Sequence, residues 1–390
     1  MRSQEDLIRT LRTAAEHAEP APTLAAAVAA RRRARRRGQR LRVALAAAAA
    51  VVLVAGGTTA VLSDRDEQAR PAVTRSAEPV AVPVAEVWPE AVFTMPGTAV
   101  DGRDYLPITA LGPTEILVGA PAPAGGLDRL EAFDTGTRTF RTIGDMPKPK
   151  VPGYGFRDVK AGEKHIVWWG ESPDAGDDAF ANFWHVPRTG GETQHIAHLT
   201  GEFAQVDGFD IVGDHIVFSI EQGGVYRLPL TGGEPRKIDG TDGLHLTSWP
   251  LAAAYPTGEP HAQERTVDLE TGRSVEASAP SGAQAFVCGS RWCAGTSDDG
   301  AFRQRLDGSD RRPLPAGLEL LAFRGLLADR FVFGRLSSGT ITTAVYDLDT
   351  GKFAGLSGGG SELGFGVPRP TVFHWGDRGE LTVLNLLAVR

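Results

Sequence analysis

Residues 346–355 read YDLDTGKFAG, and this stretch decides the fold because its pattern recurs along the chain. Apolar residues alternate with polar ones on both sides of a short turn that contains Gly351. A glycine supplies the positive φ of a tight hairpin, and an Asp or Thr before it can hydrogen-bond to the turn backbone. The stretch therefore predicts two short antiparallel strands joined by a tight turn.

The same turn pattern occurs at five earlier places. They are EAFDTGTRTF at 131–140, HVPRTGGETQ at 185–194, RLPLTGGEPR at 227–236, VDLETGRSVE at 267–276 and RQRLDGSDRR at 303–312. Repetition of one supersecondary unit is typical of repeat architectures, so the whole region is interpreted as an array of similar sheets.

A second family of apolar strands lies between these turns. Its members are centred on Ile116, Ile166, Ile216, Leu251, Trp292, Phe331 and Leu381, which gives a mean spacing of about 44 residues. That spacing is the size of one four-stranded propeller blade.

The repeat resembles the TolB-like, WD40-like and PQQ-type propeller group, in which hairpins of this kind join the outer strands of each blade. The resemblance covers roughly 87–390 and implies an all-β, seven-bladed β-propeller, with six blades as the alternative if one weak segment is a loop. The WD40 G-H and W-D signatures are missing, so the subfamily stays open. Because the chain ends just after the seventh strand, residues 86–96 (EVWPEAVFTMP) are expected to complete the final blade and close the ring.

Composition agrees with a folded domain of short strands. Hydrophobic residues make up 42% and charged residues 23% of 390, so neither a disordered chain nor a multi-span membrane protein is expected. Glycine and proline are frequent, at 47 and 26 residues, as many tight turns require.

The first 62 residues follow a different pattern. Val43 to Leu62 carries no charge and is long enough to cross a bilayer once, at about 30 Å. Eight arginines lie between Arg31 and Arg42, whereas acidic residues follow the segment, so the positive-inside rule places the N-terminus in the cytoplasm. A cleaved signal peptide remains the main alternative, and an arginine run that binds nucleic acid is the least favoured one.

These features divide the chain into a basic cytoplasmic tail at 1–42, a transmembrane helix at 43–62, a proline-rich linker at 63–87 and an extracytoplasmic propeller at 88–390. Residues 3–18 have apolar positions at helical spacing, which predicts a short amphipathic helix. This tail resembles the cytoplasmic ends of membrane-anchored regulators such as anti-sigma factors, but no cysteine precedes Cys288, so the zinc motif of that family is absent.

The two cysteines, Cys288 and Cys293, fall on two expected antiparallel strands with a short turn between them. Opposed positions in such a hairpin permit a disulfide, and an extracytoplasmic location favours one.

The sequence contains no recognisable catalytic or cofactor-binding motif. The sequence has no G-x-S-x-G elbow, Walker loop or dinucleotide fingerprint. His195 and His198 are three positions apart, which on a regular strand places them on opposite sides and argues against a shared metal ion. We therefore expect a protein that is not an enzyme and has no metal, no cofactor and no nucleic-acid partner, although carboxylate pairs assembled from distant blades stay open.

Binding is expected on the face that carries the long connections, because function concentrates on loops held by a rigid scaffold. Two of these connections, 145–156 and 172–182, combine aromatic and charged side chains. The predicted binding residues are Lys148, Lys150, Tyr154, Phe156, Asp174, Asp177, Asp178 and Phe180.

The sequence thus favours a single-pass, membrane-anchored extracytoplasmic β-propeller that binds a small ligand or a protein. One alternative is a membrane regulator whose cytoplasmic helix at 3–18 contacts a protein partner, and another is an exported propeller hydrolase or lyase.

Overall fold

The computed structural model describes residues 81–121, 127–147, 149–151, 153–172, 179–255, 262–321, 325–336, 343–356, 363–364, 366–377 and 379–390. All of them belong to one compact unit that spans 75–390. The predicted tail and transmembrane segment lie outside the described residues, as does most of the linker. Among the residues that are described, no helix has the length and apolar character needed to cross a membrane.

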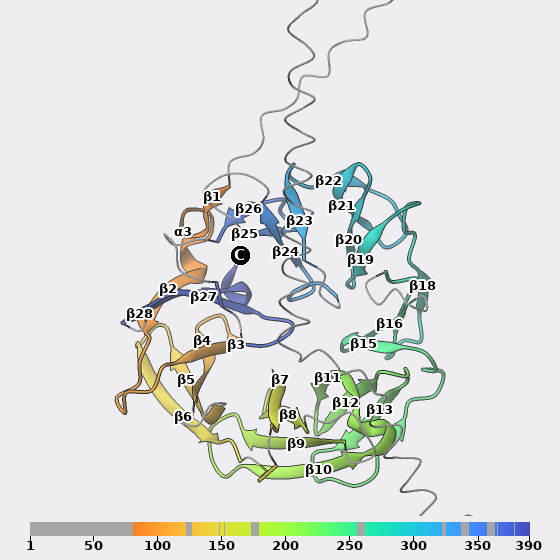
Figure 1. The fold of residues 1–390 in the computed structure, drawn as a ribbon. Coiled ribbons are helices and arrows are strands. Elements are labelled where there is room, and N and C mark those ends of the chain that lie inside the picture. Colours follow the sequence, from red (N-terminus) through yellow and green to blue (C-terminus); the bar gives the residue numbers. More distant parts are fainter. Residues whose placement is uncertain are drawn as a thin grey trace, which may run out of the picture. The chain divides into compact units, whose positions relative to one another are not determined.

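Seven β-sheets follow one another around a ring, as Figure 1 shows. The first five sheets have four antiparallel strands each, in chain order from the inside of the ring outward. Blade 1 contains β3 (Leu106–Gly112), β4 (Glu115–Pro121), β5 (Leu127–Asp134) and β6 (Thr139–Asp145); blade 2 contains β7 (Gly155–Ala161), β8 (His165–Glu171), β9 (Phe180–Pro187) and β10 (Gln194–Thr200). Blade 3 contains β11 (Val206–Val212), β12 (His215–Ile220), β13 (Val225–Pro229) and β14 (Arg236–Lys237), preceded by the short helix η2 (Gly201–Ala204). Blade 4 contains β15 (His245–Ser248), β16 (Leu251–Ala254), β17 (Arg265–Asp268) and β18 (Ser274–Glu276); blade 5 contains β19 (Gln284–Cys288), β20 (Trp292–Ser297), β21 (Gly300–Arg305) and β22 (Arg312–Pro313).

The last two blades incorporate strands from both ends of the unit. Blade 6 has β23 (Leu318–Leu320), β24 (Phe331–Leu336), β25 (Thr343–Asp347) and β26 (Phe353–Gly355), and β1 (Val82–Pro83) adds a parallel fifth strand beside β26. Blade 7 has β27 (Val372–Gly376) and β28 (Glu380–Asn385), and β2 (Val92–Pro96) pairs antiparallel with β28. The helices α3 (Val84–Val87) and η1 (Pro89–Ala91) connect β1 to β2, and η3 (Leu386–Ala388) follows β28. The seven-bladed fold and its closure by residues 86–96 are therefore confirmed, and the first strand among the described residues begins at Val82.

Both repeated sequence patterns have a fixed place in a blade. The six glycine turns join the third and fourth strands, and the seven apolar segments are the second strands. The innermost strands are the first of each blade, since β3 contacts β7 and β27, and β11 contacts β7 and β15.

The core lies between neighbouring sheets. In β4 the five central residues are all buried, because the second strand of a blade has a sheet packed on each of its two faces. Between blades 2 and 3, for example, Phe183 contacts Phe209 and Phe218 with ring centroids 5.8 Å and 5.7 Å apart. The ring is thus a rigid support for its surface loops.

Candidate binding sites

Strand order gives the ring two distinct faces. Turns between the first and second strands, and between the third and fourth, lie at one end of the blades and form what we call the hairpin face. Second-to-third loops and blade-to-blade connections lie at the other end, which we call the loop-rich face. The connections at 146–154, 172–179, 255–264 and 356–371 belong to the loop-rich face, as the sequence predicts. The connection at 321–330 is an exception, because it joins the first two strands of blade 6, β23 and β24, and therefore belongs to the hairpin face.

Two of the predicted residues meet on the loop-rich face of blade 2. Tyr154 precedes β7, Phe180 opens β9, and their rings stack with centroids 6.0 Å apart and an angle of 17° between the planes. The tyrosine reaches across β8 because that strand has a glycine at Gly170. A Cβ atom there would lie 2.5 Å from the Tyr154 hydroxyl and 2.6 Å from the carbonyl oxygen of Gly155.

Three polar side chains extend this stack into what we call the Tyr154 cluster: Tyr154, Phe180, Asn182, His195 and His198. The ring of His198 lies 4.7 Å from that of Phe180. The Oδ1 atom of the buried Asn182 lies 2.9 Å from His198 Nδ1 and 3.3 Å from His195 Nε2. Two imidazoles therefore converge on one amide oxygen.

This convergence corrects the expectation that the two histidines face opposite sides of their strand. The register of β10 against β9 shifts between His195 and Ala197, and such a bulge inserts one residue and restores both side chains to one face. The sequence gives no signal for the bulge, so Asn182 and both histidines were missed as members of the site. No group of three or more metal-ligating side chains occurs among the described residues.

Burial sets the protonation of the cluster. It raises the pKa of Tyr154, and hydrogen bonds from Trp184 and Asn182 only partly oppose it, so the phenol stays protonated at neutral pH. Burial, followed by the neighbouring His198, lowers the pKa of His195, so this imidazole is neutral at pH 7. Tyr154 and His195 thus offer aromatic surface and uncharged hydrogen-bonding groups.

The remaining predicted residues are dispersed. Phe156 packs into the core between blades 1 and 2, and Lys150 is exposed on the connection between these blades. Lys148, Asp174, Asp177 and Asp178 lie outside the described residues.

The disulfide is present in the structure. Cys288 and Cys293 are bonded to each other and are direct register partners at the ends of β19 and β20, beside a three-residue turn. The bond closes a local loop at the hairpin face of blade 5.

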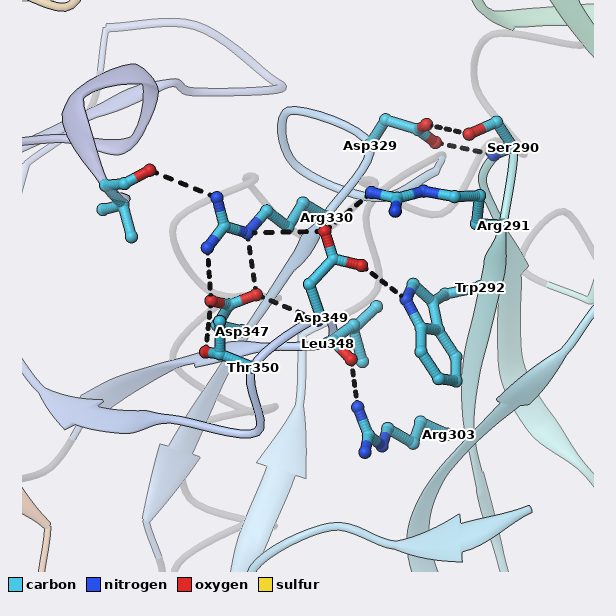
Figure 2. A network of polar contacts seen from close by, with 11 residues as sticks. Ser290, Arg291, Trp292, Arg303, Asp329, Arg330, Asp347, Leu348, Asp349 and Thr350 are labelled. Atoms are coloured by element: carbon cyan, nitrogen blue, oxygen red, sulfur yellow. Dashed lines mark hydrogen bonds and ion pairs between the residues drawn. The ribbon is translucent and has the colours of Figure 1, made fainter. Parts of the chain in front are cut away.

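A polar network on the hairpin face joins blades 5 and 6 (Figure 2). Arg330 donates to both carboxylate oxygens of Asp347, at 2.8 Å and 2.6 Å, and to the carbonyl oxygen of Val389 at 3.1 Å. Burial alone would raise the pKa of Asp347, but hydrogen bonds from Arg330 and Thr350 outweigh it and hold the pKa below its ordinary value. The pair ties the start of β24 to the chain's last residues.

Asp349 extends the network to blade 5. One of its carboxylate oxygens accepts from the Trp292 indole at 2.7 Å and the other from Arg291 at 2.6 Å, as Figure 2 shows. Arg303 lies over the Trp292 ring, 4.6 Å from its centroid, and donates to the carbonyl oxygen of Leu348. We interpret this network as a structural joint, because nearly every donor in it has a partner within the protein.

No protein-family model and no curated protein matches the sequence. Among solved structures, the chain is similar to YCF48 bound to a D1 peptide, with 12% identity over 75% of this chain and 96% of that one and a TM-score of 0.46. It is also similar to BamB from Moraxella catarrhalis, with 12% identity over 71% and 83% and a TM-score of 0.36. A third is the Cps50 (Swd1) propeller domain of Myceliophteria thermophila, with 9% identity over 74% and 98% and a TM-score of 0.42. Because these identities and TM-scores are low, we assign the fold from the sheet topology described above. The chain is a seven-bladed β-propeller.

Proposed function

We propose that the propeller is a protein-binding module whose contact surface is centred on the Tyr154 cluster. The observation that carries this proposal is a group of rings at the loop-rich face, in which the half-buried Tyr154 and Phe180 stack on each other and the exposed His198 packs at an angle against Phe180. Partly exposed aromatic side chains fixed by a packed support are typical of the residues that dominate binding energy in protein interfaces.

Preorganisation supports the same proposal. Gly170 makes room for the tyrosine and Asn182 holds the two imidazoles, so the rings are ordered before a partner arrives. A partner that binds them loses less side-chain entropy than one that must order a flexible surface. The exposed Lys150, four residues before Tyr154 in the same connection, adds a positive charge to this face.

The test is photo-crosslinking from two surface positions in cells that make the full chain. A photoreactive residue in place of Lys150 should give a discrete protein adduct, whereas one in place of the exposed Thr231 on the hairpin face should not. Tyr154→Ala should reduce the Lys150 adduct several-fold, and Tyr154→Phe, which keeps the ring, should reduce it less.

Equal adducts at both positions, or an adduct that Tyr154→Ala leaves unchanged, would place the interface elsewhere. The circular dichroism and unfolding temperature of each variant are compared first, so that loss of an adduct is not confused with loss of the fold.

We further propose that residues 43–62 anchor this module, with the tail at 1–42 in the cytoplasm and the propeller outside. The charge asymmetry around the apolar segment supports this orientation, and the disulfide between Cys288 and Cys293 is consistent with an oxidising compartment.

A further inference from the structure

A cavity of about 320 Å³ opens between blades 4 and 5 on the hairpin face, opposite to the face proposed for protein binding. Its walls include Leu251 and Val275 of blade 4 and Leu306 of blade 5. The volume is at the lower end of the range of small-molecule sites and is sufficient for one substituted aromatic ring.

One polar group in the wall has no partner among the described residues. The hydroxyl of Thr266, in β17, is buried and makes no hydrogen bond to the part of the protein that the structure describes. The residue as a whole is 4% exposed. Buried hydroxyls in proteins are nearly always hydrogen-bonded, so this one points to a group that enters the cavity.

The rim carries charges of both signs. Three arginines line the cavity, Arg273, Arg291 and Arg305, against two aspartates. Arg291 is bound to Asp349, and Arg305 lies over the Trp292 ring, 3.6 Å from its centroid. Arg273 forms no ion pair of 4 Å or less with a described residue, although its charge helps to lower the pKa of Asp268, and we assign its guanidinium to the ligand.

The two aspartates in the wall are committed to their own turns. Asp268 accepts from the backbone amides of Glu270 and Thr271, at 2.9 Å and 3.0 Å. Asp307 accepts from the amide and the hydroxyl of Ser309, at 2.9 Å and 2.6 Å. These hydrogen bonds lower the pKa of both carboxylates and keep them ionised, so a ligand meets both aspartates as well as the arginines.

We propose that this cavity binds a small organic anion, a carboxylate or a phosphate ester that carries an apolar group. The anionic oxygens pair with Arg273 and accept from the Thr266 hydroxyl, and the apolar group lies against Leu251 and Val275. Charge-assisted hydrogen bonds to a guanidinium give such a site its preference for anions.

Four probes that share one ring test the proposal by calorimetric titration of the purified full chain. Benzoate and phenyl phosphate should bind, and the tighter of the two identifies the anionic group that the site prefers. Benzyl alcohol, which is neutral, and benzylamine, which is a cation, should bind at least about tenfold more weakly, since neither can accept a charge-assisted hydrogen bond from Arg273.

Thr266→Val is the most informative variant. It keeps the shape of the side chain and removes a hydroxyl that no described group satisfies, so the unfolding temperature should hold or rise while the affinity for the anion falls about fivefold. Arg273→Gln should weaken binding about tenfold or more. Arg335→Gln, at an exposed position on blade 6, is the matched control and should leave the affinity unchanged.

Three results would overturn the proposal: benzyl alcohol or benzylamine binding as tightly as benzoate, no binding of either anion, or affinities that Arg273→Gln and Thr266→Val leave unchanged. Since the Tyr154 cluster is on the opposite face, Tyr154→Ala should leave benzoate binding intact. The two proposals can therefore fail independently.

Discussion

Asp347 is fully buried, and its charge is balanced by a single arginine. Its partner Arg330 is 21% exposed and also holds the carbonyl oxygen of Val389. Loss of one member of a buried pair leaves the other charge uncompensated, which costs more than the pair itself contributes.

Asp347→Asn should therefore lower the free energy of unfolding by about 3 kcal/mol, measured by urea denaturation. Asp310→Asn is the control, because Asp310 and Arg312 form an ion pair in which the arginine side chain is 63% exposed, and we expect a change of under about 1 kcal/mol. Equal effects of the two substitutions would show that the network of Figure 2 does not stabilise the joint between blades 5 and 6.

His374 makes stability depend on acidity. It lies in β27, its Nδ1 atom is buried without a hydrogen-bond partner among the described residues, and burial lowers its pKa to about 4. An unfolded chain binds the same proton near pH 6.5, so the unfolded state takes up more protons between these two values. The contribution of His374 to stability is complete above pH 6.5 and is lost as the pH falls from 6.5 to 4.

Unfolding temperatures measured between pH 6.5 and pH 4 test whether stability falls as the pH falls. The wild-type protein should lose more stability than His374→Phe between pH 6.5 and pH 4, because the phenylalanine cannot be protonated. Parallel curves for the two proteins would mean that other groups cause the acid sensitivity.

At the scale of single elements, local sequence determines the glycine hairpins. The irregular features of the sheets depend instead on pairing with a neighbouring strand. The aspartates at the start of the glycine turns bond to turn amides, as Asp134 does to Gly136 and Thr137 at 2.9 Å and 2.7 Å, so a short pattern was enough to find these turns. The bulge in β10 and the parallel pairing of β1 with β26 depend on a neighbouring strand, and neither leaves a local signature.

The same reasoning explains which parts of the sites could be predicted. Tyr154 and Phe180 stand out as aromatic residues in long connections, and strand order alone places them on one face. The cavity at Thr266 was not predicted. It forms between blades 4 and 5, and the strands that make its walls have no unusual composition.

The β19–β20 hairpin provides a test at this scale. The Cys288→Ala, Cys293→Ala double variant should stay folded and lose about 2 kcal/mol of stability, since closing so short a loop restricts the unfolded chain only slightly. Mass spectrometry of an unreduced digest should show the two cysteines linked in the wild-type protein. Free thiols in protein recovered from its native location would contradict both the bond and the expected compartment.

At the scale of the whole molecule, the basic tail and the acidic remainder have opposite net charges. Residues 1–42 contain 11 arginines and 4 acidic residues, whereas the full chain has a net charge of -7. This asymmetry is the basis for the proposed orientation, with the tail inside and the propeller outside.

Reporter fusions decide the orientation directly. A reporter at Gln39 should give a cytoplasmic signal and one after Arg390 an external signal. Two cytoplasmic signals, or two external signals, would exclude a single crossing between these positions.

A pull-down with residues 1–42 tests whether the tail at 3–18 has a protein partner of its own.

The closure of the ring also sets the order of events during biosynthesis. Val92 leaves the ribosome long before its partner in the sheet, Leu384, because almost all of the propeller lies between them in the sequence. Until then β2 has no strand to join, and the growing chain carries an open sheet edge of the kind that aggregates. We expect the nascent chain to need protection by a chaperone until β28 has left the ribosome, and the ring to become resistant to protease only after that point.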